Sequence, residues 1–186
     1  HPRVRRQRQM CIRDRGTFIN LQKGVWCNVE RITAMPEASA EVSGDNRHPE
    51  IKGRIEFYGV YGGTVVVAEV SGLTEAGTGQ EQGFYGFHIH EGASCTGKQS
   101  DSFANTGGHY NPGNKSHPQH AGDLPPLLSD AGEAWMSVYT SRFFPEDVIG
   151  KTVVIHDRPD DFHTQPSGDS GEKIACGKIV AEDKTD

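Results

Sequence analysis

Apolar and polar residues alternate at every second position in residues 51–58, which is the pattern of a strand with one buried face. Gly62 and Gly63 then precede a β-branched segment, residues 64–70, which predicts the next strand. Further strands are predicted at residues 84–90, 134–140, 151–157 and 174–181. No segment keeps a helical period over three turns. The pattern predicts an all-β sandwich or barrel rather than alternating strands and helices.

Two predicted connections are too long for hairpin turns, residues 91–123 and 158–173. Long ordered loops on a β scaffold commonly carry function. The first of them is rich in side chains that can bind a metal. We therefore expect the functional site to lie at these loops.

Composition excludes several classes of protein. A chain of 186 residues with 34% hydrophobic residues is long enough for one well-cored domain. No apolar run approaches the roughly 20 residues that a membrane-spanning helix needs, so no membrane span is expected. The net charge of −6 argues against a nucleic-acid partner, because phosphate binding needs a basic surface.

The N-terminal residues 1–15 are rich in arginine and show no apolar periodicity. Residues 10–15 back-translate into the transposon end used in sequencing libraries. We therefore expect residues 1–15 to derive from a sequencing adapter and exclude them from the fold, as for an expression tag. Residues 16–38 form an N-terminal segment of undecided structure, and residues 39–186 form the predicted domain.

His88 and His90 are separated by one residue, so on a strand both imidazoles point to the same face and can bind one ion. Alone, such a pair more commonly consists of two surface or hydrogen-bonded histidines. A second group in the long loop strengthens the metal interpretation: His109, His117, His120 and Asp123. Three nitrogens and one carboxylate oxygen complete a closed tetrahedral zinc shell. His156 ends a predicted strand and would complete a nitrogen-rich copper site with the first pair.

Five motifs in order carry a specific resemblance: GFHIHEG, GGHYNPGN, HAGDLP, KTVVIHDRPDD and GEKIACGKI. Together they resemble the copper/zinc superoxide dismutase family, especially its bacterial branch. The resemblance covers roughly residues 39–181. It implies an eight-stranded Greek-key β-barrel with two long functional loops. It also implies dismutation of the superoxide anion to oxygen and hydrogen peroxide, by copper that alternates between Cu(II) and Cu(I).

Matching positions imply the ligands of both metals. Copper would be bound by His88, His90, His109 and His156, and zinc by His109, His117, His120 and Asp123. His109 would then bridge the two ions. Asp160 matches an aspartate of the family that links a copper-ligand histidine to a zinc-ligand histidine by hydrogen bonds.

Lys173 occupies the position of the family's active-site arginine, three residues before a cysteine. Lysine keeps the positive charge that attracts superoxide but lacks the rigid bidentate fork. The loop around it is rich in acidic residues. We expect a rate below the family's ceiling and a shallow dependence on salt, which a steep fall in rate with added salt would contradict.

The resemblance pairs Cys95 with Cys176 in a disulfide, whereas Cys27 has no evident partner. A persistent disulfide favours an extracytoplasmic compartment, although a cytoplasmic location stays open. A homodimer is possible. A non-catalytic copper- and zinc-binding relative, a metal buffer or chaperone, is the alternative function; loss of a copper ligand would have favoured it, and all four are present.

Overall fold

The computed structural model describes residues 36–73 and 83–183. The predicted adapter segment, most of residues 16–38, and Cys27 lie outside this range. The described strands are β1 Ala38–Gly44, β2 Lys52–Val60, β3 Gly63–Ser71, β4 Gly83–Tyr85, β5 Phe87–His90, β6 Leu127–Ser129, β7 Glu133–Thr140, β8 Thr152–His156 and β9 Lys173–Ala181. Two short helical turns accompany them, η1 Ala104–Thr106 and α3 Pro145–Val148.

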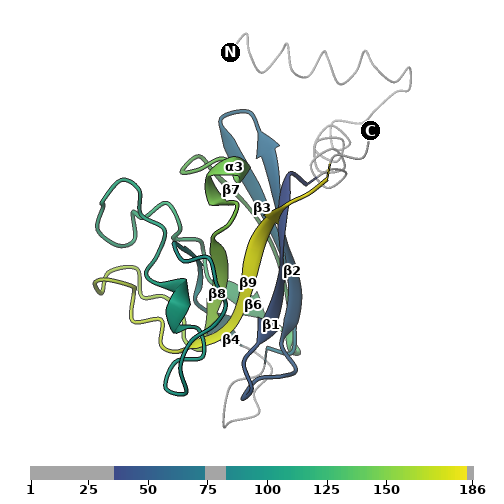
Figure 1. Cartoon of the computed structure of the whole chain (residues 1–186), viewed down its shortest axis with the longest axis vertical. Helices are drawn as coiled ribbons and strands as arrows, with labels where there is room; N and C mark the ends of the chain where they lie inside the picture. Colours follow the sequence, from purple (N-terminus) through teal and green to yellow (C-terminus); the bar gives the residue numbers. More distant parts are fainter. Residues whose placement is uncertain (1–35, 74–82, 184–186) are drawn as a thin grey trace.

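Seven strands form one curled antiparallel sheet in the order β5-β8-β9-β1-β2-β3-β7, and β4 and β6 form a separate two-stranded sheet (Figure 1). β3 pairs with β7 and β5 pairs with β8, so several connections cross over rather than run as simple hairpins. The all-β Greek-key class is confirmed. None of the helices in the described ranges is long and apolar enough to span a membrane.

The alternation predicted for residues 51–58 is confirmed on the core side. Ile51, Ile55 and Phe57 are buried, while Lys52 on the other face is exposed. Tyr58 differs from the pattern: it is buried, and its hydroxyl donates to the Glu56 carboxylate. Its ring therefore packs while its polar tip keeps a hydrogen bond.

The predicted strand at residues 84–90 is divided in the structure at Gly86, which is why the described strands number nine rather than eight. β4 pairs with β6, whereas β5 pairs with β8 in the large sheet. A Cβ at Gly86 would lie 2.9 Å from the Ser170 Cβ and 3.1 Å from the His156 Cβ. Glycine at this position lets the chain pass between the end of β8 and the second loop and change sheets.

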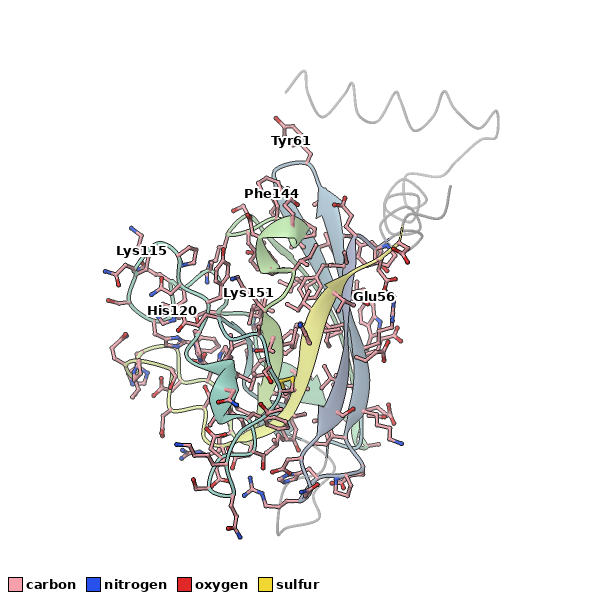
Figure 2. The ribbon with its side chains drawn as sticks, in the orientation of Figure 1. Glu56, Tyr61, Lys115, His120, Phe144 and Lys151 are labelled. Atoms are coloured by element: carbon pink, nitrogen blue, oxygen red, sulfur yellow. A yellow bond between two sulfur atoms is a disulfide. The ribbon has the colours of Figure 1, made fainter. Side chains whose placement is uncertain are left out.

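The two long loops lie together on one side of the sheet (Figure 1). Lys115 and His120 lie on this side, whereas Glu56 lies on the opposite side of the molecule (Figure 2). Gln165 of the second loop joins the two by accepting from the His117 backbone N–H and donating to its carbonyl. The two loops are thus joined to each other beside strands β5 and β8.

Candidate metal centre

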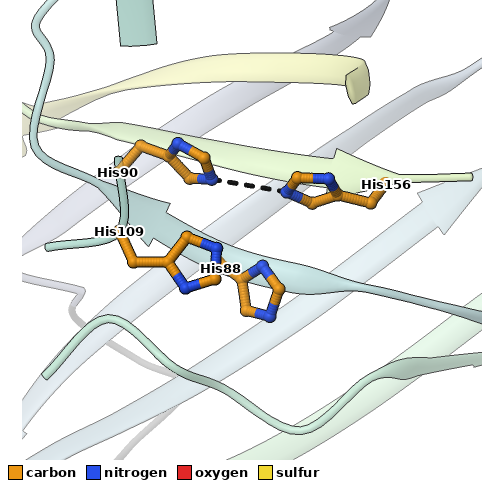
Figure 3. A group of neighbouring side chains, drawn as sticks. All are labelled: His88, His90, His109 and His156. Carbon is orange, nitrogen blue, oxygen red and sulfur yellow. Dashed lines mark hydrogen bonds between the residues drawn. The ribbon is translucent and has the colours of Figure 1, made fainter. Parts of the chain in front are cut away.

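Strands β5 and β8 supply the first group of histidines. His88 and His90 are almost fully buried on β5, and His156, at the end of the neighbouring β8, is 4% exposed. The Nε2 atoms of His90 and His156 lie 3.3 Å apart, and His109 lies beside them (Figure 3). Ile89, between the two histidines of β5, packs in the core. Both imidazoles of β5 thus lie in one group of histidines.

The first loop folds back against β5 and brings the second group of histidines to the first. Tyr110 donates its backbone N–H to the Ile89 carbonyl, and the Ile89 N–H is donated to the Gly122 carbonyl. A Cβ at Gly122 would lie 2.2 Å from the Ile89 carbonyl oxygen, so only glycine permits this approach. These contacts place His109 and Asp123 directly beside β5.

Both predicted ligand groups are assembled, and the structure places one candidate nitrogen or oxygen of each member within 4.8 Å of the others in its group. The groups are His88, His90, His109 and His156, and His109, His117, His120 and Asp123. His109 belongs to both groups. Their convergence from two strands and a loop is the arrangement that a two-metal centre requires.

His90 and His156 of the first group each use one ring nitrogen for a hydrogen bond to a backbone carbonyl. The second ring nitrogen of each points into the group. His90 Nδ1 lies 2.9 Å from the Gly107 carbonyl, and His156 Nδ1 lies 3.3 Å from the Gly171 carbonyl. Hydrogen bonds of this kind set the tautomer and orientation of a metal-binding imidazole.

Several buried ring nitrogens in the two groups have no hydrogen-bond partner: His88 Nδ1, His109 Nε2, His117 Nδ1 and His120 Nδ1. The Nδ1 atoms of His117 and His120 each lie 3.2 Å from an Asp123 carboxylate oxygen without hydrogen-bond alignment. His109 Nδ1 lies 2.7 Å from the same carboxylate. Buried polar atoms are rarely left unsatisfied. The convergence of these unpartnered ring nitrogens therefore fits a bound metal ion. In the second group, three histidine nitrogens and the Asp123 carboxylate fit zinc.

Asp160 lies between the two groups and contacts one histidine of each. Its Oδ2 lies 2.7 Å from His88 Nε2, and its Oδ1 lies 2.9 Å from His117 Nε2. Its Oδ1 also accepts the Phe162 backbone N–H. Burial would raise the pKa of Asp160, but these hydrogen bonds outweigh burial and hold the pKa well below its usual range. The carboxylate is therefore ionised and can orient both imidazoles.

Burial keeps the three strand histidines of the first group, His88, His90 and His156, neutral. It lowers the pKa of His88 to about 4, although the hydrogen bond to Asp160 opposes this effect. Burial lowers the pKa of His156 to about 3 and that of His90 well below its ordinary value. Asp123 is ionised, because its hydrogen bond to His109 opposes the effect of burial and its pKa is lowered. Neutral imidazoles and an ionised carboxylate are the protonation states that metal ions bind.

Lys173 lies at the start of β9, but its ammonium is held by the first loop. Lys173 Nζ lies 3.1 Å from Asp101 Oδ2 and 3.3 Å from the Phe103 carbonyl. The sequence analysis gave Asp101 no role. Its carboxylate nevertheless faces the one basic group predicted to attract the substrate.

Arg142 is a second residue that the sequence analysis missed. Its Nη1 donates to the carbonyl oxygens of Pro118, His120 and Asp123, at 3.0–3.2 Å. One guanidinium nitrogen thus ties together the part of the loop that carries two candidate zinc ligands. No local motif around Arg142 points to this role, because its partners lie about 20 positions earlier in the chain.

The predicted disulfide between Cys95 and Cys176 is confirmed, with the two Cα atoms 5.6 Å apart. It ties the first loop to β9 across 81 positions of sequence. Phe103 and Val154 pack against it in a small second core. The disulfide thus anchors the part of the loop that contacts Lys173.

Comparison with known proteins identifies the family. The profile described as "Copper/zinc superoxide dismutase (SODC)" matches residues 51–179. A relative from Deinococcus radiodurans named "Superoxide dismutase [Cu-Zn]" is 35% identical over 137 residues, 64% of this chain and 71% of the relative. One from Aquifex aeolicus, "Superoxide dismutase [Cu-Zn] 2", is 30% identical over 151 residues, 72% of this chain and 82% of the relative.

The fold agrees with a solved structure. The copper/zinc superoxide dismutase from Brucella abortus superposes with a TM-score of 0.65 at 27% identity, over 78% of this chain and 100% of that one. The profile match spans most of the domain, and both histidine groups lie within it. The chain belongs to the copper/zinc superoxide dismutase family and is therefore an oxidoreductase that acts on superoxide, with copper and zinc as its metals.

Proposed function

We propose that the two histidine groups form the dismutase centre of this chain. Copper would be held by His88, His90, His109 and His156, and zinc by His109, His117, His120 and Asp123. The observation that carries this proposal is the set of buried ring nitrogens that converge without a hydrogen-bond partner. In His88, His90 and His156, the ring nitrogen that faces away from the group is hydrogen-bonded to the protein.

When bound, copper supplies one-electron redox chemistry, by which two superoxide anions and two protons become one oxygen and one hydrogen peroxide. The protein positions the groups that this reaction needs. His109 directs Nδ1 toward Asp123 and leaves Nε2 in the first group. It can therefore hold a proton at Nε2 and release it to the reduced product, while Nδ1 stays with the second group.

Asp160 acts through the histidines that it contacts and is a positioning residue. Because it bonds His88 and His117, one from each group, it couples the orientation of the copper side to that of the zinc side. Lys173 supplies a positive charge near His156 for an approaching anion.

Titration of metal-free protein with Cu(II) and Zn(II) tests this assignment. The wild type should bind one ion of each per chain. Asp160→Asn should keep this stoichiometry but lose about 10- to 100-fold in affinity, because the amide cannot accept from both imidazoles as a carboxylate does. Asp161→Asn, in the same loop but bonded to Thr164, is the matched control. Equal affinities in Asp160→Asn and the wild type would remove Asp160 from the centre.

We also propose that the protein works outside the cytoplasm. The Cys95–Cys176 disulfide supports this, because disulfides persist in oxidising compartments. A relative from Brugia pahangi, 29% identical over 182 residues, is named an extracellular superoxide dismutase. Fractionation of the native cells would test the location, and recovery in the cytoplasm would contradict it.

We propose a homodimer as the assembly. β7 is an edge strand of the described sheet, and Trp135 and Tyr139 on it are 63% and 53% exposed. Exposed aromatic side chains along an edge favour association. Sedimentation velocity should show a dimer at micromolar concentration, and a monomer would overturn the proposal.

A further inference from the structure

A shift of register brings Lys173 opposite His156. Between β8 and β9 the pairing runs Val154 with Cys176 and Ile155 with Ala175, and then moves by one position to pair His156 with Lys173. Ile174 is thereby left in the core, 2% exposed. The stem of Lys173 starts beside a candidate copper ligand.

The ammonium of Lys173 does not extend freely from this position. It lies 3.1 Å from Asp101 Oδ2, and the Lys173 side chain is only 16% exposed. Asp101 is itself fixed: its Oδ1 accepts the Phe103 N–H at 3.0 Å, and its backbone exchanges two hydrogen bonds with Lys98. A rigid turn of the first loop thus holds the charge that the substrate would meet.

Two other acidic groups in this region, Glu172 and Asp45, already have basic partners. Glu172, next to Lys173, bonds Arg47 at 2.6 Å. Asp45 is buried and bonds both Arg47 and His48. Among the described residues, Lys173 is the one ion-pair partner of Asp101. An approaching anion therefore meets a closed ion pair at Lys173 rather than a free cation.

We infer that Asp101 is a positioning residue that limits anion capture by holding the Lys173 ammonium against the first loop. This inference rests on the proposed copper group, since it concerns the approach of an anion to it. A paired charge produces a much weaker field at a distance than a single charge, and a held ammonium cannot turn toward the incoming anion. The family's guiding positive charge is thus present in this chain but restrained.

Asp101→Asn tests the inference, because the amide oxygen can still accept the Phe103 N–H while the negative charge is lost. With both metals loaded, superoxide decay at low ionic strength should become about threefold faster, and the gain should disappear as salt is added. Azide, a small anion that binds copper, should bind about threefold more tightly in an absorption titration. Asp169→Asn removes the same charge from an exposed pair with Arg158 and should change neither readout by more than about 1.3-fold.

The same Asp101→Asn substitution in a Lys173→Gln background distinguishes two effects of Asp101: holding the Lys173 ammonium in place, and repelling the anion by its own negative charge. There, Asp101→Asn should give a clearly smaller gain, because no ammonium remains to be released. An equal gain in both backgrounds would show that Asp101 acts only as a field charge and would overturn the inference, as would no gain in either. Asp101→Glu should restore wild-type behaviour, and thermal melts should confirm that every variant folds. Copper binding without any superoxide decay would count against the proposed function alone, because azide affinity still tests Asp101.

Discussion

Replacing His109 with alanine should reduce dismutase activity by more than about 100-fold and weaken both metal sites together. Loss of a residue that only orients a ligand already costs about 10- to 100-fold in affinity or activity, so loss of a ligand shared by two ions should cost more. His109 is the one residue that belongs to both candidate groups. The measurement is metal content after dialysis, together with the rate of superoxide decay.

Two further variants serve as controls for His109→Ala. His117→Ala should lower zinc content and leave copper largely bound, because His117 belongs to the second group alone. His163→Ala should change nothing, since its side chain is 79% exposed and lies outside both groups. Retention of both metals and full activity in His109→Ala would refute the shared site.

Removing the disulfide should produce the largest loss of stability. In the chain-entropy model, closing the 81-position loop between Cys95 and Cys176 stabilises the fold by about 4–5 kcal/mol. A double Cys95→Ser, Cys176→Ser variant of metal-free protein should therefore melt about 10–15 °C lower than the wild type. Activity of the loaded variant should also fall, because the released loop carries Gly107, whose carbonyl holds the Nδ1 of the candidate copper ligand His90.

Cys27→Ser is the control for the disulfide, because it removes a thiol but leaves Cys95 and Cys176 in place. Its melting temperature should match the wild type within about 1 °C. A double serine variant that melts with the wild type would show that the crosslink contributes little to the fold.

The strands that local pattern predicts are those with bulky alternating or β-branched residues. β1 was not predicted as a separate segment, since its sequence ASAEVSG holds one large apolar residue; its pairing with both β2 and β9 decides its conformation. β6 has three residues, too few to show a period. The division at Gly86 depends on the close approach of Ser170 and His156, which local sequence does not encode.

In the candidate site, too, some residues could be predicted from the sequence and others could not. The ligand groups were predictable because metal binding demands particular residue types, and ordered motifs supplied their pairing. The roles of Asp101 and Arg142 were not predictable, because an acidic residue in a polar loop and an arginine after a strand are common in any sequence. Their roles exist only where Lys173 and the carbonyls of the first loop are brought to them by folding.

Superoxide decay catalysed by the protein loaded with one copper and one zinc per chain tests the central claim most directly, with His156→Ala measured beside it. His156 lies in the copper group alone, so its loss should leave zinc in place and reduce the rate by more than about 100-fold. Fast decay in the wild type and its loss in the variant is the predicted result. Full metal occupancy without turnover, or equal rates in the two proteins, would contradict the assignment.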